Sequence, residues 1–144
     1  MVLYLYIKKG RKELATMSVY AVSDLHGCLD TYYKIKKLLK PEDKVYCLGD
    51  CGDRGPEPWA TIKSVYQDPQ FIYLKGNHED MLTKASWESL YHSSSKYQRL
   101  LAHNGGYDTL LGLLEEKEPL DWISKLEDLP TSEYYINKKG QKIF

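Results

Sequence analysis

The run Gly49-Asp50-Cys51-Gly52-Asp53-Arg54-Gly55 follows a short apolar stretch, residues 45–48, that is typical of a buried strand. Two similar runs flank it in the sequence, Asp24-Leu25-His26-Gly27 and Gly76-Asn77-His78-Glu79, and each also follows an apolar stretch. All three combine glycine with carboxylate, imidazole or amide side chains. Because glycine permits tight turns and close backbone approach, we interpret these runs as functional loops at the ends of strands.

The order of the predicted elements favours a parallel sheet. Apolar stretches alternate with segments of helical periodicity, in the order strand 18–23, helix 29–39, strand 45–48, helix 59–66 and strand 71–74. Asp24 and Asp50 are 26 residues apart, and Asp50 and Asn77 are 27 apart, which is about the length of one βαβ unit. The sequence therefore predicts an α/β fold with a mainly parallel sheet and flanking helices.

The rest of the chain is predicted to be helical until Pro130. Helical periodicity covers residues 80–90, 97–102, 109–116 and 120–126. The apolar stretches 134–136 and 142–144 then flank a turn-like segment, which predicts a hairpin.

The composition is that of one ordinary globular domain, since 42% of the 144 residues are hydrophobic and 28% are charged. Twenty basic residues balance twenty acidic ones, so net charge gives no reason to expect a nucleic-acid or membrane partner. Cys28, Cys47 and Cys51 form no Cys-x-x-Cys pair. We therefore expect reduced thiols in a cytoplasmic protein, with Cys47 and Cys51 in packing and turn positions.

The first residues are expected to lie outside the domain. Met17 directly precedes the first predicted strand, and the segment 8–13 is charged and aperiodic. We predict that residues 1–16 are a leader or a non-native extension and that residues 17–144 form the domain. The apolar run 1–7 is too short to span a bilayer and is followed by charges, unlike an anchor or a signal peptide.

The three loops are predicted to meet, because the carboxyl ends of neighbouring parallel strands share one edge of a sheet. This edge gathers the side chains of Asp24, His26, Asp50, Asn77 and His78, among which carboxylates, an imidazole and an amide oxygen form a possible metal-ligand set. Their mixed oxygen and nitrogen atoms suit manganese, iron or zinc better than a thiolate-bound metal. Two such ions about 3.5–4 Å apart hold both the attacking and the leaving oxygens of a phosphoryl group, and Asp50 is the natural bridging ligand.

Two further groups in these runs suit phosphoryl chemistry. The planar guanidinium of Arg54 matches the oxygens of a phosphate group. His78 is a candidate to give a proton to the leaving oxygen, and a carboxylate such as Asp53 could orient its ring.

The order of the three runs resembles the phosphoprotein phosphatase branch of the calcineurin-like metallophosphoesterases. Bacterial and phage serine/threonine protein phosphatases and diadenosine tetraphosphatases are the most similar members. The later residues Asn104-Gly105-Gly106 and Thr109 resemble a segment of the bacterial members, so the likeness extends from about Ser18 to the end of the chain. It implies the N-terminal part of an α-β-β-α sandwich, in which two sheets pack face to face between helices.

The resemblance implies a ligand set for two metal ions. Asp24, His26 and Asp50 match the ligands of the first ion, and Asp50 and Asn77 match ligands of the second. The implied cofactors are two divalent ions, with manganese expected first and iron, zinc or cobalt as alternatives.

The resemblance also implies catalytic and phosphate-binding roles. His78 matches the proton donor, Asp53 its carboxylate partner, and Arg54 a phosphate-binding arginine. Asn77 and Lys75 match positions next to the substrate phosphate. Many members have an arginine where Lys75 stands, and lysine keeps its charge but loses its bidentate geometry.

The chain departs from the family pattern after the predicted hairpin. The family uses two further histidine ligands for the second metal, in segments that lie beyond the match, and this chain ends at Phe144. We therefore expect a C-terminally truncated domain with an incomplete second metal site and most of its second sheet missing. An uncovered apolar sheet face favours association, so a homo-oligomer is a further expectation.

The main functional prediction is a dinuclear-metal-dependent phosphomonoester hydrolase of the serine/threonine protein phosphatase type. Its substrate would be a phosphorylated protein or a small phosphoester. The alternatives are a truncated remnant with impaired catalysis, a dinucleoside tetraphosphatase, and a module that binds phosphorylated ligands without cleaving them. Short motifs do not separate these readings, because substrate preference depends on groove residues.

Overall fold

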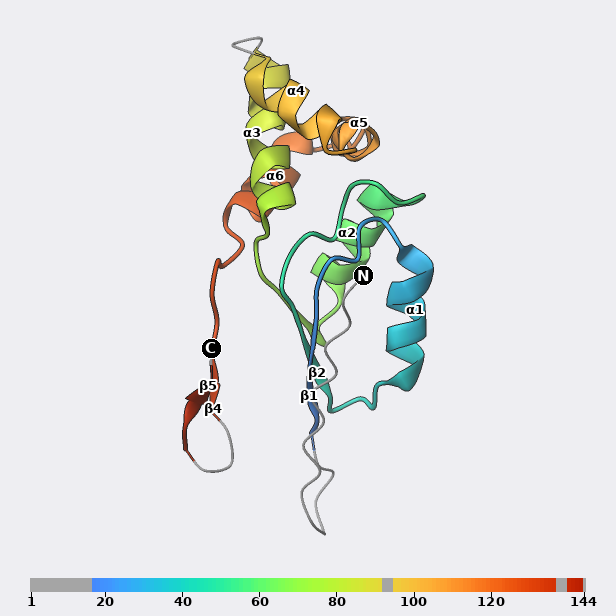
Figure 1. The fold of residues 1–144 in the computed structure, drawn as a ribbon, viewed down its shortest axis with the longest axis vertical. Helices are drawn as coiled ribbons and strands as arrows, with labels where there is room; N and C mark the ends of the chain where they lie inside the picture. The colour runs from blue at the N-terminus through green and yellow to red at the C-terminus, as the bar shows by residue number, and fades with distance from the viewer. Residues whose placement is uncertain (1–16, 92–94, 137–139, 144) are drawn as a thin grey trace.

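The computed structural model describes residues 17–91, 95–136 and 140–143. The predicted leader, residues 1–16, lies outside this part, and its nature stays a prediction. The elements follow in the order β1 (Val19–Val22), α1 (Leu29–Leu38), β2 (Lys44–Cys47), α2 (Pro58–Gln67), β3 (Phe71–Tyr73), α3 (Asn77–Tyr91), α4 (Lys96–His103), α5 (Tyr107–Leu114), α6 (Pro119–Glu127), β4 (Tyr135–Ile136) and β5 (Lys142–Ile143) (Figure 1).

Strands β1, β2 and β3 form a parallel sheet with β2 at its centre. Val22 lies beside Cys47, and Cys47 lies beside Tyr73, so the three strands end at the same level. The loops that follow the strands therefore leave the sheet at one edge. The predicted α/β class, with a mainly parallel sheet and flanking helices, is confirmed.

The two faces of this sheet differ in burial. In β2, Val45 and Cys47 are buried in the core with Ile62 of α2, whereas Tyr46 between them is half-buried. Helices α1 and α2 contact each other and lie on the same side of the sheet (Figure 1). The predicted association of copies through the less covered face stays a prediction.

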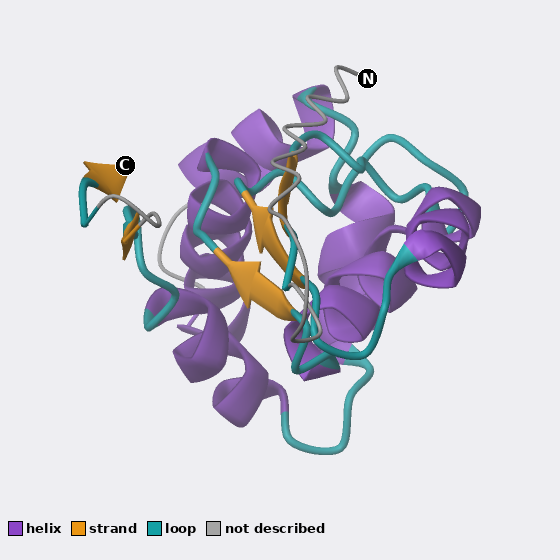
Figure 2. Ribbon diagram, turned by 90° about the horizontal axis from the view of Figure 1, so that it is seen from below, coloured by secondary structure: helices purple, strands orange, loops and turns teal. Residues whose placement is uncertain are grey.

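Helices α3 to α6 gather beyond the carboxyl ends of the strands (Figure 1). They join the rest of the fold through contacts of α5 with α2, and they pack on each other through α3 against α4 and α6. Their inward side chains are fully buried at Leu82, Leu101, Leu113, Ile123 and Leu126. Proline at the first position of α2 and of α6 suits a helix start, since proline lacks the backbone N–H that goes unpaired there. Figure 2 shows the strands of the parallel sheet at the centre with helices around them, and the short strands near the C-terminus at the periphery.

The second sheet consists, within the described residues, of the antiparallel pair β4 and β5. Tyr135 pairs with Ile143, which places both strands inside the segments predicted to form a hairpin. The expectation that most of the second sheet of the sandwich is missing stays a prediction. No helix in the described part of the chain has the length and apolar character needed to cross a membrane.

Candidate functional site

The loops after β1 and β2 are joined by backbone hydrogen bonds. The N–H of Asp24 donates to the carbonyl of Gly49 (3.3 Å), that of His26 to Asp50 (3.0 Å), and that of Gly27 to Cys51 (2.7 Å). The pairing of the parallel strands thus continues into the first two runs. It brings the metal-ligand candidates of both loops to the same edge of the sheet.

The loop after β3 approaches the loop after β2 at a pair of glycines. Gly49 has a φ of +95°, and a Cβ added to it would lie 2.4 Å from the Cα of Gly76. A Cβ on Gly76 would in turn lie 2.3 Å from Oδ1 of Asp50. Any side chain at either position would push the second and third runs apart, so these two glycines permit the site to form.

Strained backbone is concentrated in this site. Within the described residues, positive φ at residues other than glycine occurs at Asp24 (58°), His26 (42°), Asp50 (56°), Asp53 (65°) and Arg54 (66°). Each belongs to the first two runs and to the predicted set of functional residues. Left-handed backbone at such residues costs free energy and persists where the surrounding contacts fix it, so the fold holds these side chains in directions they would not adopt in a free loop.

The carboxylate of Glu79 fixes the second and third runs together. It accepts hydrogen bonds from the backbone N–H groups of Asp50 (2.8 Å), Cys51 (2.9 Å) and Gly76 (2.8 Å), and from the hydroxyl of Tyr73 (2.8 Å). Glu79 is 1% exposed. The sequence contains Glu79 in the third run but gave no role for it, because these donors come from residues that meet only in the folded chain.

The residues at this edge fit a divalent metal ion. Ligand atoms of His26, Asp50 and His78 lie within 4.8 Å of one another, and Oδ1 of Asp24 lies 3.6 Å from Nε2 of His26. The cluster found by geometry contains His78, whereas the sequence predicted Asp24 as the third ligand of the first ion. Both residues border His26, and the mixture of carboxylate and imidazole atoms is the one expected for manganese, iron or zinc.

The side chain of Asn77 also faces Asp50. Its NH₂ group donates to both carboxylate oxygens of Asp50, at 3.1 Å to Oδ1 and 2.8 Å to Oδ2. The role of Asn77 as a metal ligand stays a prediction.

His78 is bound on one side of its ring. Its Nδ1 lies 2.5 Å from Oδ2 of Asp53, and both residues are buried, at 3% and 1% exposure. Its backbone N–H donates to Oδ1 of Asp50 (3.0 Å), which ties the start of α3 to the metal-ligand cluster. The predicted contact between the ring of His78 and a buried carboxylate is therefore present, and Nε2 of the ring faces Nη2 of Arg54. The role of His78 as a proton donor stays a prediction.

Arg54 lies across the two histidines. Its Nη1 is 3.4 Å from Nε2 of His26, and its Nη2 is 3.3 Å from Nε2 of His78. The backbone N–H of Arg54 donates to the carbonyl of Gly105 (2.9 Å), and its Nε donates to the carbonyl of Asn104 (3.3 Å). An exposed guanidinium held in this way can meet a phosphate group placed over the cluster.

Lys75 lies apart from this group. Its Nζ donates to the carbonyl oxygen of Glu127 (2.6 Å), the last residue of α6, and its backbone N–H donates to Pro130 (2.8 Å). A cation there offsets the partial negative charge at the end of a helix. Its predicted contact with the substrate phosphate stays a prediction, and its position gives it a structural partner instead.

Changing Lys75 to Gln is expected to affect stability more than hydrolysis. The loss of a cation at the end of α6 should lower the free energy of unfolding by about 0.3–1 kcal/mol, while the hydrolysis rate stays near that of the unchanged protein. Urea denaturation and steady-state kinetics measure the two quantities. A large fall in kcat with unchanged stability would show that Lys75 reaches the substrate after all.

Cys47, the last residue of β2, packs against Cys51 of the second run. Their Sγ atoms are 3.1 Å apart, and both residues are 0% exposed. Burial raises the pKa of the Cys51 thiol well above its usual range, and the hydrogen bond with Cys47 adds to this effect. Both features favour neutral thiols in packing positions, as the sequence predicted.

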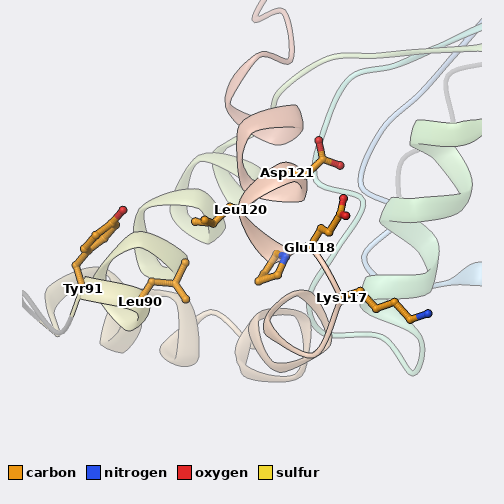
Figure 3. A pocket seen from close by; sticks show the side chains of 7 residues that line it. Leu90, Tyr91, Lys117, Glu118, Leu120 and Asp121 are labelled. Atoms are coloured by element: carbon orange, nitrogen blue, oxygen red, sulfur yellow. The ribbon is translucent and has the colours of Figure 1, made fainter.

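An open groove of about 620 Å³ lies between the end of α3 and the start of α6 (Figure 3). It is lined by Leu90, Tyr91, Lys117, Glu118, Pro119, Leu120 and Asp121. None of these residues belongs to the three runs, so we give the groove no part in the candidate site.

A sequence model of the calcineurin-like phosphoesterases matches residues 17–141 of this chain. The chain belongs to this family. The match covers all three runs and extends through the helices that follow them. It confirms the metallophosphoesterase family that was predicted from the motifs. Members of this family use divalent metal ions.

Two curated proteins with similar sequences are named as symmetrical bis(5'-nucleosyl)-tetraphosphatases. The chain is 32% identical over 119 residues to the symmetrical bis(5'-nucleosyl)-tetraphosphatase of Pseudomonas fluorescens (strain SBW25), a match that covers 76% of this chain and 37% of that protein. It is 27% identical over 127 residues to the protein of the same name from Nitrosospira multiformis, which covers 83% of this chain and 42% of the relative. The chain thus spans about two fifths of the length of these curated relatives.

A solved crystal structure also resembles this chain. It is assigned provisionally as a diadenosine tetraphosphatase, and it shares 20% sequence identity and a TM-score of 0.49, covering 78% of this chain and 42% of that one. The names of the curated relatives agree with one of the predicted alternatives, the dinucleoside tetraphosphatase. They give no support to the main prediction of a serine/threonine protein phosphatase.

Proposed function

We propose that this chain supplies the metal-binding and proton-transfer groups of a phosphohydrolase that cleaves a bis(5'-nucleosyl) tetraphosphate. The observation that carries the proposal is the cluster of His26, Asp50 and His78 with Arg54 lying across both histidines. The names of the similar proteins supply the substrate class. A serine/threonine phosphopeptide remains the competing substrate, because the three runs suit either phosphoester.

The predicted ligands divide between two ions. Asp24, His26 and Asp50 would hold the first, and Asp50 with Asn77 would contribute to the second. When bound, divalent ions polarise phosphoryl oxygens and lower the pKa of coordinated water. Manganese is the first candidate, and iron, zinc and cobalt suit the same ligand atoms.

The remaining groups orient the substrate and move a proton. Arg54 would bind the oxygens of the phosphate under attack through paired N–H donors, which keep their charge during turnover. His78 would give the proton on Nε2 to the leaving oxygen, while Asp53 holds Nδ1 on the opposite side of the ring. This arrangement needs neither a covalent intermediate nor a nucleophilic side chain.

The proposal predicts metal-dependent release of nucleoside diphosphate from diadenosine tetraphosphate. The purified chain is incubated with Mn²⁺, Fe²⁺, Zn²⁺ or Co²⁺ in separate reactions, and the nucleotides are separated by chromatography. Symmetrical cleavage should give ADP as the nucleotide product, and a chelator should abolish it. A phosphoserine peptide and an aryl phosphate serve as comparison substrates under the same conditions.

The possible results of this assay distinguish the candidate functions. Cleavage of the phosphopeptide without cleavage of the dinucleotide would replace the proposed substrate by a phosphoprotein. Tight binding of either compound without hydrolysis, in the presence of each metal, would favour a non-hydrolytic module or an impaired remnant.

A further inference from the structure

Thr109 of α5 is buried directly against Asp53. It is 0% exposed, and its hydroxyl accepts a hydrogen bond from the backbone N–H of Asp53 (3.1 Å). The same hydroxyl donates to Oδ1 of Asp53. One side chain from a distant helix thus binds both the backbone and the carboxylate of a single residue.

The contact between Thr109 and Asp53 is one end of a series of hydrogen bonds that leads to His78. Oδ1 of Asp53 binds Thr109, and Oδ2 of Asp53 binds Nδ1 of His78 (2.5 Å). On the other side of the imidazole, Nε2 faces Nη2 of Arg54 (3.3 Å). The orientation of Nε2 therefore depends on the carboxylate of Asp53, and that carboxylate depends on Thr109.

The turn before α5 supports the neighbouring residue in the same way. Gly105 accepts the backbone N–H of Arg54, and a Cβ added to Gly106 would lie 2.7 Å from Oδ2 of Asp53. The segment from residue 104 to residue 109, which we call the α4–α5 elbow, therefore packs on both Asp53 and Arg54. Gly106 leaves the space that the carboxylate occupies.

Asp53 needs such support because its backbone is strained. Asp53 and Arg54 have φ values of 65° and 66°, a conformation that residues other than glycine adopt where neighbouring contacts compensate for its cost. The Asp53 N–H and Oδ1 are both buried, so each would lose its partner if the Thr109 hydroxyl were removed. A carboxylate freed in this way can rotate and release Nδ1 of His78.

We propose that Thr109 is a positioning residue that fixes Asp53 so that the ring of His78 presents Nε2 to the leaving oxygen. The inference rests on the proposed function, in which a water oxygen bonds to phosphorus and the P–O bond to the leaving group breaks. The leaving oxygen takes the proton of Nε2, and the proton lost by the water restores the ring. Thr109 touches none of the reacting atoms and acts through Asp53.

The test compares Thr109→Val, which keeps the shape but removes the hydroxyl, with Thr109→Ser, which keeps the hydroxyl. Hydrolysis is measured for aryl phosphates that range from good to poor leaving groups. Thr109→Val should lower kcat by about 10–100-fold for the poor leaving groups, as the loss of an orienting partner typically does, and much less for the good ones. KM should change little, and Thr109→Ser should restore the rate.

A uniform loss of rate across the leaving groups would overturn the inference, because it would indicate a general structural defect. So would equal rates for Thr109→Val and Thr109→Ser. If Thr109→Val does not fold, Thr109→Ala takes its place in the same comparison.

A second readout does not depend on catalysis. In ¹⁵N-labelled protein without metal, the Nδ1–H proton of His78 should give a downfield, slowly exchanging signal that Thr109→Ser keeps and Thr109→Val loses. The signal is assigned with His78→Gln. If the unchanged chain hydrolyses no phosphoester, the proposed function fails while this spectrum still decides the role of Thr109. Persistence of the signal in Thr109→Val would overturn the proposed role of Thr109.

Discussion

Replacing Asp50 by Asn is expected to lower metal-dependent hydrolysis at least roughly 10³-fold in kcat. Removing a single electrostatic stabiliser typically costs about 10²–10³, and Asp50 is the ligand predicted to serve both ions. Its carboxylate lies within the cluster of His26 and His78 and faces the amide of Asn77. An amide at this position keeps the shape but loses the negative charge that a divalent ion needs.

Binding of Mn²⁺ should fall together with the rate, and isothermal titration calorimetry measures it without reference to activity. The fold should survive, because asparagine also tolerates a positive φ and can still accept the backbone N–H of His78. Circular dichroism checks this. Asp30→Asn is the matched control, since Asp30 is an exposed residue of α1 paired with Lys34. If Asp50→Asn bound Mn²⁺ as tightly as this control, the assigned ligand set would be wrong.

The sheet and the meeting of the three loops could be predicted from the sequence because both depend on short-range patterns. Alternating apolar and helical segments fix the class of the fold, and the near-equal spacing of Asp24, Asp50 and Asn77 places them after successive parallel strands. The identity of these residues then gives the type of chemistry. The motifs are common to the family and do not distinguish the substrates of its members. The predicted choice of a protein phosphatase therefore gained no support.

The structural roles of the residues that hold the site in place could not be predicted from the sequence, because these roles depend on contacts between distant parts of the chain. Thr109 meets Asp53 only because α5 packs on α2, where Gly112 allows close approach to Trp59. Lys75 has the charge expected of a phosphate ligand, but the end of α6 lies near enough to bind it. Residue type and order were informative, whereas the direction of each side chain was decided by the packing of the helices.

Replacing Glu79 by Gln is expected to lower the free energy of unfolding by about 2–6 kcal/mol, because each of two buried donors left without an acceptor costs about 1–3 kcal/mol. Four donors converge on the two carboxylate oxygens of Glu79, from Asp50, Cys51, Gly76 and Tyr73. A glutamine has one oxygen, so its NH₂ group would face two of these donors in a buried site. At least two donors would then lose their acceptor.

This loss is a large share of the about 5–15 kcal/mol that stabilises a typical domain, and urea denaturation followed by circular dichroism measures it. Glu115→Gln is the matched control, because Glu115 is exposed at the end of α5 and should tolerate the change. Since Glu79 holds the second and third runs together, Mn²⁺ binding should weaken even where the variant remains folded. If Glu79→Gln had the same urea midpoint and the same Mn²⁺ affinity as Glu115→Gln, the glycine contacts alone would bring the two loops together.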